Sequence, residues 1–296
     1  MMFKPAISLT ILNNINMTNK IAKKTIFLTL VTGLLLLLLF LPKPLLADAP
    51  STSTEPTVPY DFRSDTFDIL HTHIDADFSN FTTKNLIAHV RLDMIRKSAP
   101  APLRIDLLKF TVDSLLLNGN RVMYTYDDSQ IIVSSAYLAP VGDTFSVDVF
   151  YRGTPTQIPG DWGGFYWNTT YAFNIGVSFT ENQHSFARCW IPCFDNFTER
   201  CTYSYAIQTD PSRRAVCGGM FVADSLLTPT GRISYWTLNT PIPSYLASVA
   251  VSDYAEVKST LSGSLSPIPV SLFARSLSCE INCTGNYTFC VYGRNC

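Results

Sequence analysis

Apolar and polar residues alternate with a period of two through most of the chain from Tyr60 onward. In the first run, one face is made up of Phe67, Ile69, His71 and His73. In the second run, the repeating apolar positions are Leu86, Ala88, Val90, Leu92 and Met94. Because successive side chains of a strand point to opposite faces of a sheet, this pattern predicts two strands that each bury one face. Ser79-Asn80 is the expected turn between them.

Turn signals divide the rest of the chain into short strands. Asn118-Gly119-Asn120 predicts a tight hairpin, because asparagine and glycine accept the positive φ that such a turn requires. The glycine- and aromatic-rich segment 160–167 is predicted to be a loop that packs on itself. Further strands are expected at 202–209, 214–222, 232–240 and 248–258.

No segment after the N-terminus shows the period of an amphipathic helix. We therefore predict an all-β fold of large, twisted, mainly antiparallel sheets, saddle- or sandwich-like, that follows an N-terminal signal or anchor helix. Apolar residues make up 47 % of the chain, which is enough for a substantial core. The net charge is −1 with no long run of one sign, so nucleic acid is not an expected partner.

The N-terminus has the pattern of an export signal. Lys20, Lys23 and Lys24 precede an uncharged stretch, 25–42, that contains an unbroken leucine run, and a cleavage point is expected after Ala47. Residues 1–47 are thus predicted to be an N-terminal extension and signal peptide, and 48–59 a linker. The stretch is also about as long as the shortest membrane span, so an uncleaved anchor that tethers the protein to a membrane is the alternative. Both readings predict an exported protein of the periplasm, the cell envelope or the medium.

Eight cysteines fall into two groups, Cys189, Cys193, Cys201 and Cys217 in the middle and Cys279, Cys283, Cys290 and Cys296 at the end. Export favours disulfides over zinc-bound thiolates, and the three residues between the first two cysteines do not match a zinc knuckle. Each of the middle four is equally compatible with a small buried apolar residue. A cysteine nucleophile needs a histidine partner, and His184 is close in sequence only.

The four histidines, His71, His73, His89 and His184, form no HExxH motif. The alternation places His71 and His73 together on one strand face, whereas His89 lies opposite the apolar face of the next strand. We therefore predict no metal site in this chain.

The segment 180–209, TENQHSFARCWIPCFDNFTERCTYSYAIQT, resembles the end of the N-terminal domain of zinc aminopeptidases of the aminopeptidase N and leukotriene hydrolase type. The residues that match the family's arginine and its Pro-Cys-Phe-Asp turn are Arg188, Pro192, Cys193, Phe194 and Asp195. The Glu-Pro that usually follows is replaced by Asn196-Phe197. Weaker similarities before and after this segment extend the resemblance over roughly residues 60–276.

The resemblance implies a β-saddle that caps a separate metallopeptidase domain and lines part of the pocket for the substrate's N-terminal residue. It places Gln183 in that pocket, or Glu181 or Asn182 if the register shifts. The family's zinc belongs to the catalytic domain, through HExxH and Gly-x-Met-Glu-Asn motifs that this sequence lacks. No cofactor and no catalytic residue is therefore expected in this chain, which is predicted to be inactive alone.

The cysteine-rich tail, 277–296, matches nothing in the family. We expect it to be out of frame, which would make the chain a fragment of an aminopeptidase severed from its metallopeptidase domain. The alternative is a stand-alone secreted or membrane-tethered β binding module with a genuine disulfide-bonded tail.

Overall fold

The computed structural model describes residues 62–98, 101–158, 160, 162–179, 184–227, 231–263 and 267–275, all within the unit Val58–Cys296. The expected signal, the linker, the tail 277–296 and the three candidate pocket residues 181–183 lie outside the described residues. Among the residues described, no helix is both long enough and apolar enough to cross a membrane.

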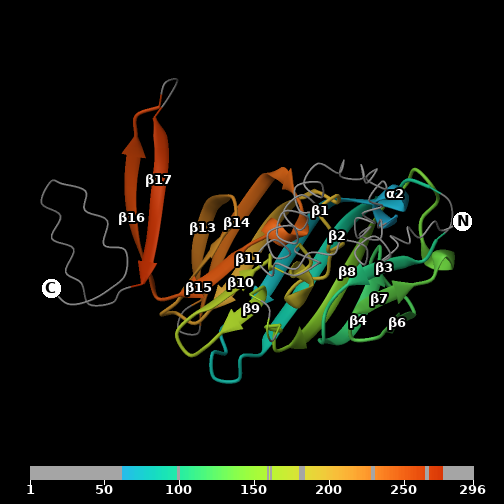
Figure 1. Ribbon diagram of the computed structural model, residues 1–296, viewed down its shortest axis with the longest axis horizontal. Helices are drawn as coiled ribbons and strands as arrows, with labels where there is room; N and C mark the ends of the chain where they lie inside the picture. Colours follow the sequence, from blue (N-terminus) through green and yellow to red (C-terminus); the bar gives the residue numbers. More distant parts are fainter. Residues whose placement is uncertain are drawn as a thin grey trace, which may run out of the picture. The chain divides into compact units, whose positions relative to one another are not determined.

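An eight-stranded sheet is the largest element of the fold (Figure 1). Its strands, in spatial order, are β13 (Met220–Leu227), β14 (Gly231–Ile242), β11 (Cys201–Thr209), β1 (Phe67–Asp77), β2 (Leu86–Arg96), β8 (Thr144–Gly153), β4 (Thr111–Leu117) and β5 (Asn120–Arg121). Neighbouring strands are antiparallel except β1 and β11, which pair in parallel. The sheet is therefore two antiparallel halves joined along β1 and β11.

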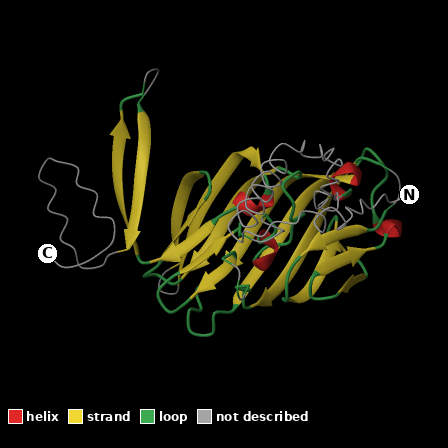
Figure 2. Cartoon of the chain, viewed as in Figure 1, coloured by secondary structure: helices red, strands yellow, loops and turns green. Residues whose placement is uncertain are grey.

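Three smaller sheets complete the described strands. They contain β12 (Arg214–Cys217), β15 (Val249–Ser252), β10 (Ala172–Ile175) and β9 (Gly164–Trp167); β3 (Leu103–Asp106), β7 (Gln130–Val133) and β6 (Tyr124–Tyr126); and β16 (Tyr254–Leu261) with β17 (Ile268–Arg275). The described helices are single turns: α2 (Arg63–Thr66), η2 (Ser135–Tyr137), η3 (Ala187–Cys189) and η4 (Ser244–Leu246). Figure 2 shows the dominance of strands, which confirms the all-β prediction.

The core lies on one side of the large sheet and follows the predicted alternation. On β2, the apolar residues from Leu86 to Met94 are buried at every second position. The predicted turn at Asn118-Gly119 is also confirmed, because both residues have positive φ, 47° and 79°, and join β4 to β5.

One predicted face is wrong. The pairing of β1 with β2 passes from Ile69–Met94 to His71–Asp93, so the register shifts at a bulge around Leu70. A bulge adds one residue to a strand and reverses the side that later residues face. Phe67 and Ile69 are buried as predicted, but His71 and His73 lie on the outer face.

The same pairing places His89 on the same face as the two other histidines. Asp75 lies opposite His89, and residues directly opposite each other in an antiparallel pair share a face. His71, His73 and His89 are therefore all on the outer face of the sheet, contrary to the parity prediction.

Three other predicted segments differ from the structure. The segment 160–167 contains a strand, β9, that pairs with β10. The predicted strand 214–222 is two strands that belong to different sheets, because the chain turns at Gly218-Gly219. A side chain at Gly219, whose φ is +99°, would approach the carbonyl oxygen of Thr237 to 2.2 Å. Likewise, 248–258 divides into β15 and β16.

Candidate functional site

The segment 187–195, which carries the Pro-Cys-Phe-Asp turn, lies between β10 and β11 and is largely buried. Its backbone forms a two-way bridge with the end of β3, because Asp106 and Cys193 exchange N–H···O bonds of 2.9 and 3.1 Å. The hydroxyl of Tyr151 on β8 donates to the carbonyl oxygen of Trp190 at 2.7 Å. The segment is therefore held by strands from two different sheets.

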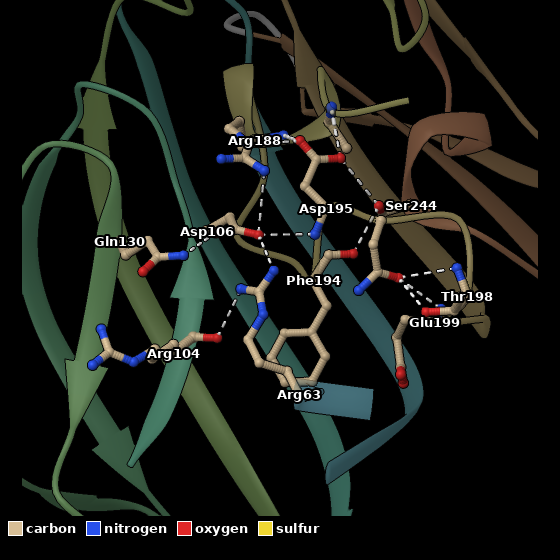
Figure 3. A network of polar contacts seen from close by, with 12 residues as sticks. Arg63, Arg104, Asp106, Gln130, Arg188, Phe194, Asp195, Thr198, Glu199 and Ser244 are labelled. Atoms are coloured by element: carbon tan, nitrogen blue, oxygen red, sulfur yellow. Dashed lines mark hydrogen bonds and ion pairs between the residues drawn. The ribbon is translucent and has the colours of Figure 1, made fainter. Parts of the chain in front are cut away.

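Asp195 organises the turn from within (Figure 3). Its carboxylate accepts hydrogen bonds from the backbone N–H groups of Ala187 and Arg188, at 3.3 and 3.0 Å, and from the Arg188 guanidinium at 2.9 Å. The hydroxyl of Ser244, at the start of η4, shares its single proton between the carbonyl oxygen of Phe194, at 3.1 Å, and the same carboxylate, at 3.3 Å. Asp195 thus forms a buried ion pair with Arg188.

A second buried carboxylate, Asp106, joins this turn to the rest of the domain. It accepts from the Asp195 backbone N–H at 3.0 Å, from Gln130 at 2.7 Å and from the Arg63 guanidinium at 2.8 Å. The Arg188 guanidinium lies 3.5 Å from the same carboxylate. Two arginines and two carboxylates therefore form one cluster, visible in Figure 3, that fixes the turn against β3 and α2.

The charged groups of this cluster are paired with one another. Burial raises the pKa of Asp195, and the Arg188 guanidinium and its hydrogen bonds oppose that rise. The Asp106 and Asp195 carboxylates accept the hydrogen bonds described above, and neither carboxylate is exposed to solvent. No proton acceptor of this cluster is therefore open to a substrate.

The four middle cysteines are buried, free thiols. Burial raises the pKa of Cys189 to about 12 and that of Cys201 to about 11, and it raises the pKa of Cys193 and Cys217 well above the usual value. Because the thiolate is the reactive form, none is an effective nucleophile at neutral pH. The interpretation of these residues as small buried apolar side chains is the one that the structure supports.

Exposed aromatic and apolar side chains flank the segment 180–183 on both sides. Before it, Trp162 and Phe179 stack at 5.4 Å between ring centroids and are 55 % and 85 % exposed. After it, the His184 ring packs against Tyr245 at 4.7 Å and Phe197 at 5.9 Å. Phe197 is itself 56 % exposed. We call these five residues the aromatic rim. The candidate pocket residues Gln183, Glu181 and Asn182 fall between its two halves in sequence.

The η4 turn, which carries Tyr245 of this rim, is held by contacts on two sides. A side chain at Gly176 would lie only 1.9 Å from the carbonyl oxygen of Tyr245, so the chain leaving β10 is in direct backbone contact with η4. The Asn174 side chain bridges the same region, donating to Ala247 O at 3.0 Å and accepting from Val249 N at 2.8 Å. Ser244 contacts the turn from the other side.

Sequence reasoning identified Arg188 and Asp195 but missed Asp106, Arg63 and Ser244. Asp106 and Ser244 are 89 and 49 residues from Asp195, and nothing local in the sequence marks them as partners. No group of three or more His, Cys, Asp or Glu side chains in the described part of the chain is arranged to hold a metal ion.

Comparisons with known proteins agree with this architecture. Residues 103–246 match the family model of the peptidase M1 N-terminal domain. The M1 zinc metallopeptidase of Deinococcus radiodurans, in its complex with a Tyr-Ser-Ala substrate, is 18 % identical with a TM-score of 0.63 over 71 % of this chain and 48 % of that one. Legionella pneumophila aminopeptidase A, in complex with aspartic acid, is 16 % identical with a TM-score of 0.59 over 71 % of this chain and 24 % of that one. No curated protein matches the chain.

Residues 103–246 therefore match a peptidase M1 N-terminal domain in sequence, and the described β domain shares the fold of the solved M1 metallopeptidases. Its structural neighbours are M1 zinc metallopeptidases, which is consistent with an N-terminal domain of that family. The chain spans about half the length of the Deinococcus protein and about a quarter of the Legionella one.

Proposed function

We propose that this chain is the non-catalytic N-terminal domain of an exported zinc aminopeptidase, and that it caps and partly lines the pocket for the peptide's N-terminus. The observation that carries the proposal is the aromatic rim, which is exposed on both sides of 180–183 while the turn beneath it is fixed by buried ion pairs. Export, either secreted or tethered by an uncleaved signal helix, is part of the proposal.

The exposed side chains of the aromatic rim are expected to be covered by another protein surface. The rim consists of two groups, Trp162 with Phe179 and His184 with Tyr245 and Phe197. Exposed aromatic side chains on a rigid support mark an interaction site. Phe179 and Phe197 expose more than half of their surface, whereas the residues beneath, such as Phe194, are fully buried. The partner is a metallopeptidase domain, which supplies the zinc ion and the catalytic base.

Gln183 would then act by positioning. An amide oxygen accepts a hydrogen bond from a substrate ammonium group, and a carboxylate at Glu181 would pair with it more strongly. Either contact fixes the peptide's first residue but activates no water molecule. The chain alone therefore binds no peptide tightly and hydrolyses none, because the pocket is complete only when both domains are present.

An assay of aminoacyl p-nitroanilide hydrolysis tests this directly. We expect no zinc-dependent turnover from the purified chain, and turnover when it is co-expressed with the metallopeptidase domain encoded by the same genome. Gln183→Ala and Glu181→Ala should raise KM in that complex. The control is Met123→Ala, at a residue that is 75 % exposed and far from 181–183 in sequence, and it should change neither KM nor kcat.

Two results would reject the proposal. One is failure of the chain to associate with the metallopeptidase domain. The other is an association that is unchanged by Phe179→Ser, since the rim would then not be the contact surface. Persistence of a soluble, monomeric chain that binds a different partner would instead support the stand-alone binding module.

A further inference from the structure

A pair of histidines on the outer face of the large sheet lies outside the candidate site. The bulge near Leu70 turns His71 and His73 outward, where β1 lies between β2 and β11 (Figure 1). Their ring centroids are 4.1 Å apart. The polar side chains that meet them come from both neighbouring strands: Thr202 and Ser204 from β11, and Asp93 from β2.

Hydrogen bonding assigns the proton on His71. The Thr202 hydroxyl donates its only proton to the carbonyl oxygen of Leu70, at 3.1 Å. It must therefore accept in its contact with His71 Nδ1, at 2.6 Å, so Nδ1 carries the proton. The other ring nitrogen, Nε2, then presents a lone pair, and it faces the Ser204 hydroxyl at 2.9 Å.

The position of the proton on His73 can be assigned in the same way. Its Nε2 lies 3.2 Å from the Asp93 carboxylate, which also accepts from Arg91 at 2.8 Å. A carboxylate only accepts, so His73 Nε2 carries the proton and Nδ1 presents a lone pair. That lone pair also faces the Ser204 hydroxyl, at 2.7 Å.

Two imidazole lone pairs thus converge on one hydroxyl that has a single proton to donate. One of the two nitrogens is left without a donor while both rings are neutral. A single cation between the two nitrogens can bind both lone pairs. Imidazole nitrogen is a preferred ligand of divalent transition metals.

We propose that His71 Nε2 and His73 Nδ1 bind a divalent transition-metal ion, Zn²⁺ or Cu²⁺, on the outer face of β1. Asp93 and Thr202 act as outer partners that fix the ring orientations, as carboxylates and hydroxyls do around metal-bound histidines. Ser204 Oγ and water complete the coordination, because the described residues offer no third His, Cys, Asp or Glu ligand at this point. The site is open, since half of the His73 side chain is exposed.

A metal ion at this site competes with protons for the histidine nitrogens. Burial lowers the pKa of His71, and the neighbouring His73 lowers it further, while Asp93 opposes both effects. A histidine binds a metal ion through a ring nitrogen that carries no proton. The ion is expected to bind more weakly as the pH falls through the range in which histidine is protonated.

The test is calorimetric titration of the full 296-residue chain, purified and stripped with chelator, with ZnCl₂ alone at pH 7.5. We expect one ion per chain, with binding lost or at least tenfold weaker in both His71→Gln and His73→Gln. Asp93→Asn should weaken binding about 10- to 100-fold, because it removes the group that orients His73. Co²⁺ in place of Zn²⁺ should give a visible ligand-field spectrum that the same variants abolish.

His89→Gln is the matched control. His89 is on the same sheet face and contacts a carboxylate, Asp148 at 2.8 Å, but it belongs to no convergent pair. Its variant should bind Zn²⁺ like the wild type. Absence of stoichiometric binding in the wild type, or equal loss in His89→Gln, would overturn the proposal.

One further outcome would also overturn it. If NMR titration shows that the His71 and His73 pair takes up a proton near neutral pH and Zn²⁺ does not displace it, the lone pairs are satisfied by protonation alone. The titration uses no metallopeptidase domain and no residue of the aromatic rim, so its failure would leave the proposed function untouched.

Discussion

Removing the charge of Asp106 is the sharpest test of the cluster that fixes the Pro-Cys-Phe-Asp turn. The Asp106→Asn change keeps the shape of the side chain but leaves the guanidinium groups of Arg63 and Arg188, 2.8 and 3.5 Å away, with one carboxylate fewer. The NH₂ group of the new amide would also face the N–H donors of the two guanidinium groups. Breaking a buried ion pair by changing one partner typically costs about 3–5 kcal/mol.

The structure places this variant at the lower end of that range. Asp106 is fully buried, but the side chains of Arg63 and Arg188 are 16 % and 24 % exposed and regain part of their hydration when the carboxylate is lost. We therefore expect a loss of about 3 kcal/mol in the free energy of unfolding. Urea denaturation followed by tryptophan fluorescence, to which the buried Trp190 contributes, would measure it.

Asp113→Asn is the matched control, since it breaks an ion pair of similar length, 3.0 Å, between Asp113 and Arg152. These side chains are 36 % and 56 % exposed, and such pairs contribute about 0–1 kcal/mol. Equal losses in the two variants, or a loss below about 1 kcal/mol for Asp106→Asn, would refute the view that this cluster fixes the turn.

Three other outcomes are expected. Gly176→Ala should destabilise the domain by about 2 kcal/mol or more, because the new methyl group would lie 1.9 Å from the Tyr245 carbonyl oxygen; an unchanged melting temperature would contradict this contact. In native protein at pH 8, Cys189, with a pKa of about 12, should resist iodoacetamide and react only after urea is added, as peptide mass mapping would show. The backbone N–H groups of Gln130 and Ser129 lower the pKa of Asp127, so its stabilising effect is present above the unfolded value of about 3.9 and is lost as the pH falls below it. Asp127→Asn should therefore flatten the acid limb of the stability curve, and an unchanged slope below pH 4 would contradict that.

Local chemistry predicted much of this fold. The alternation along β2 and the Asn118-Gly119 turn depend only on neighbouring residues, and both are found in the structure. Arg188 and Asp195 are seven residues apart, so their ion pair was also predictable. Such features are encoded within a few residues, where period and turn chemistry are informative.

Other features depend on distant contacts. The bulge near Leu70 reflects how β1 pairs with β2, and a one-residue insertion in a ladder leaves no trace in the alternation of a single strand. The break at Gly218-Gly219 depends on the close approach of Thr237 from β14. The partners of Asp195 are likewise set by tertiary packing, which explains why Asp106 and Ser244 were missed.

The parallel pairing of β1 with β11 also has a consequence for the order in which the molecule forms. Residues paired across this junction, such as His71 and Thr202, are 131 positions apart in sequence. The antiparallel pairs on either side connect strands that are closer in sequence, such as β1 with β2 and β13 with β14. Because long loops close slowly, each half of the sheet is expected to fold before the two halves join. Ser204 meets the two histidines only across that junction, so a metal ion bound there would be a reporter of the last step of folding.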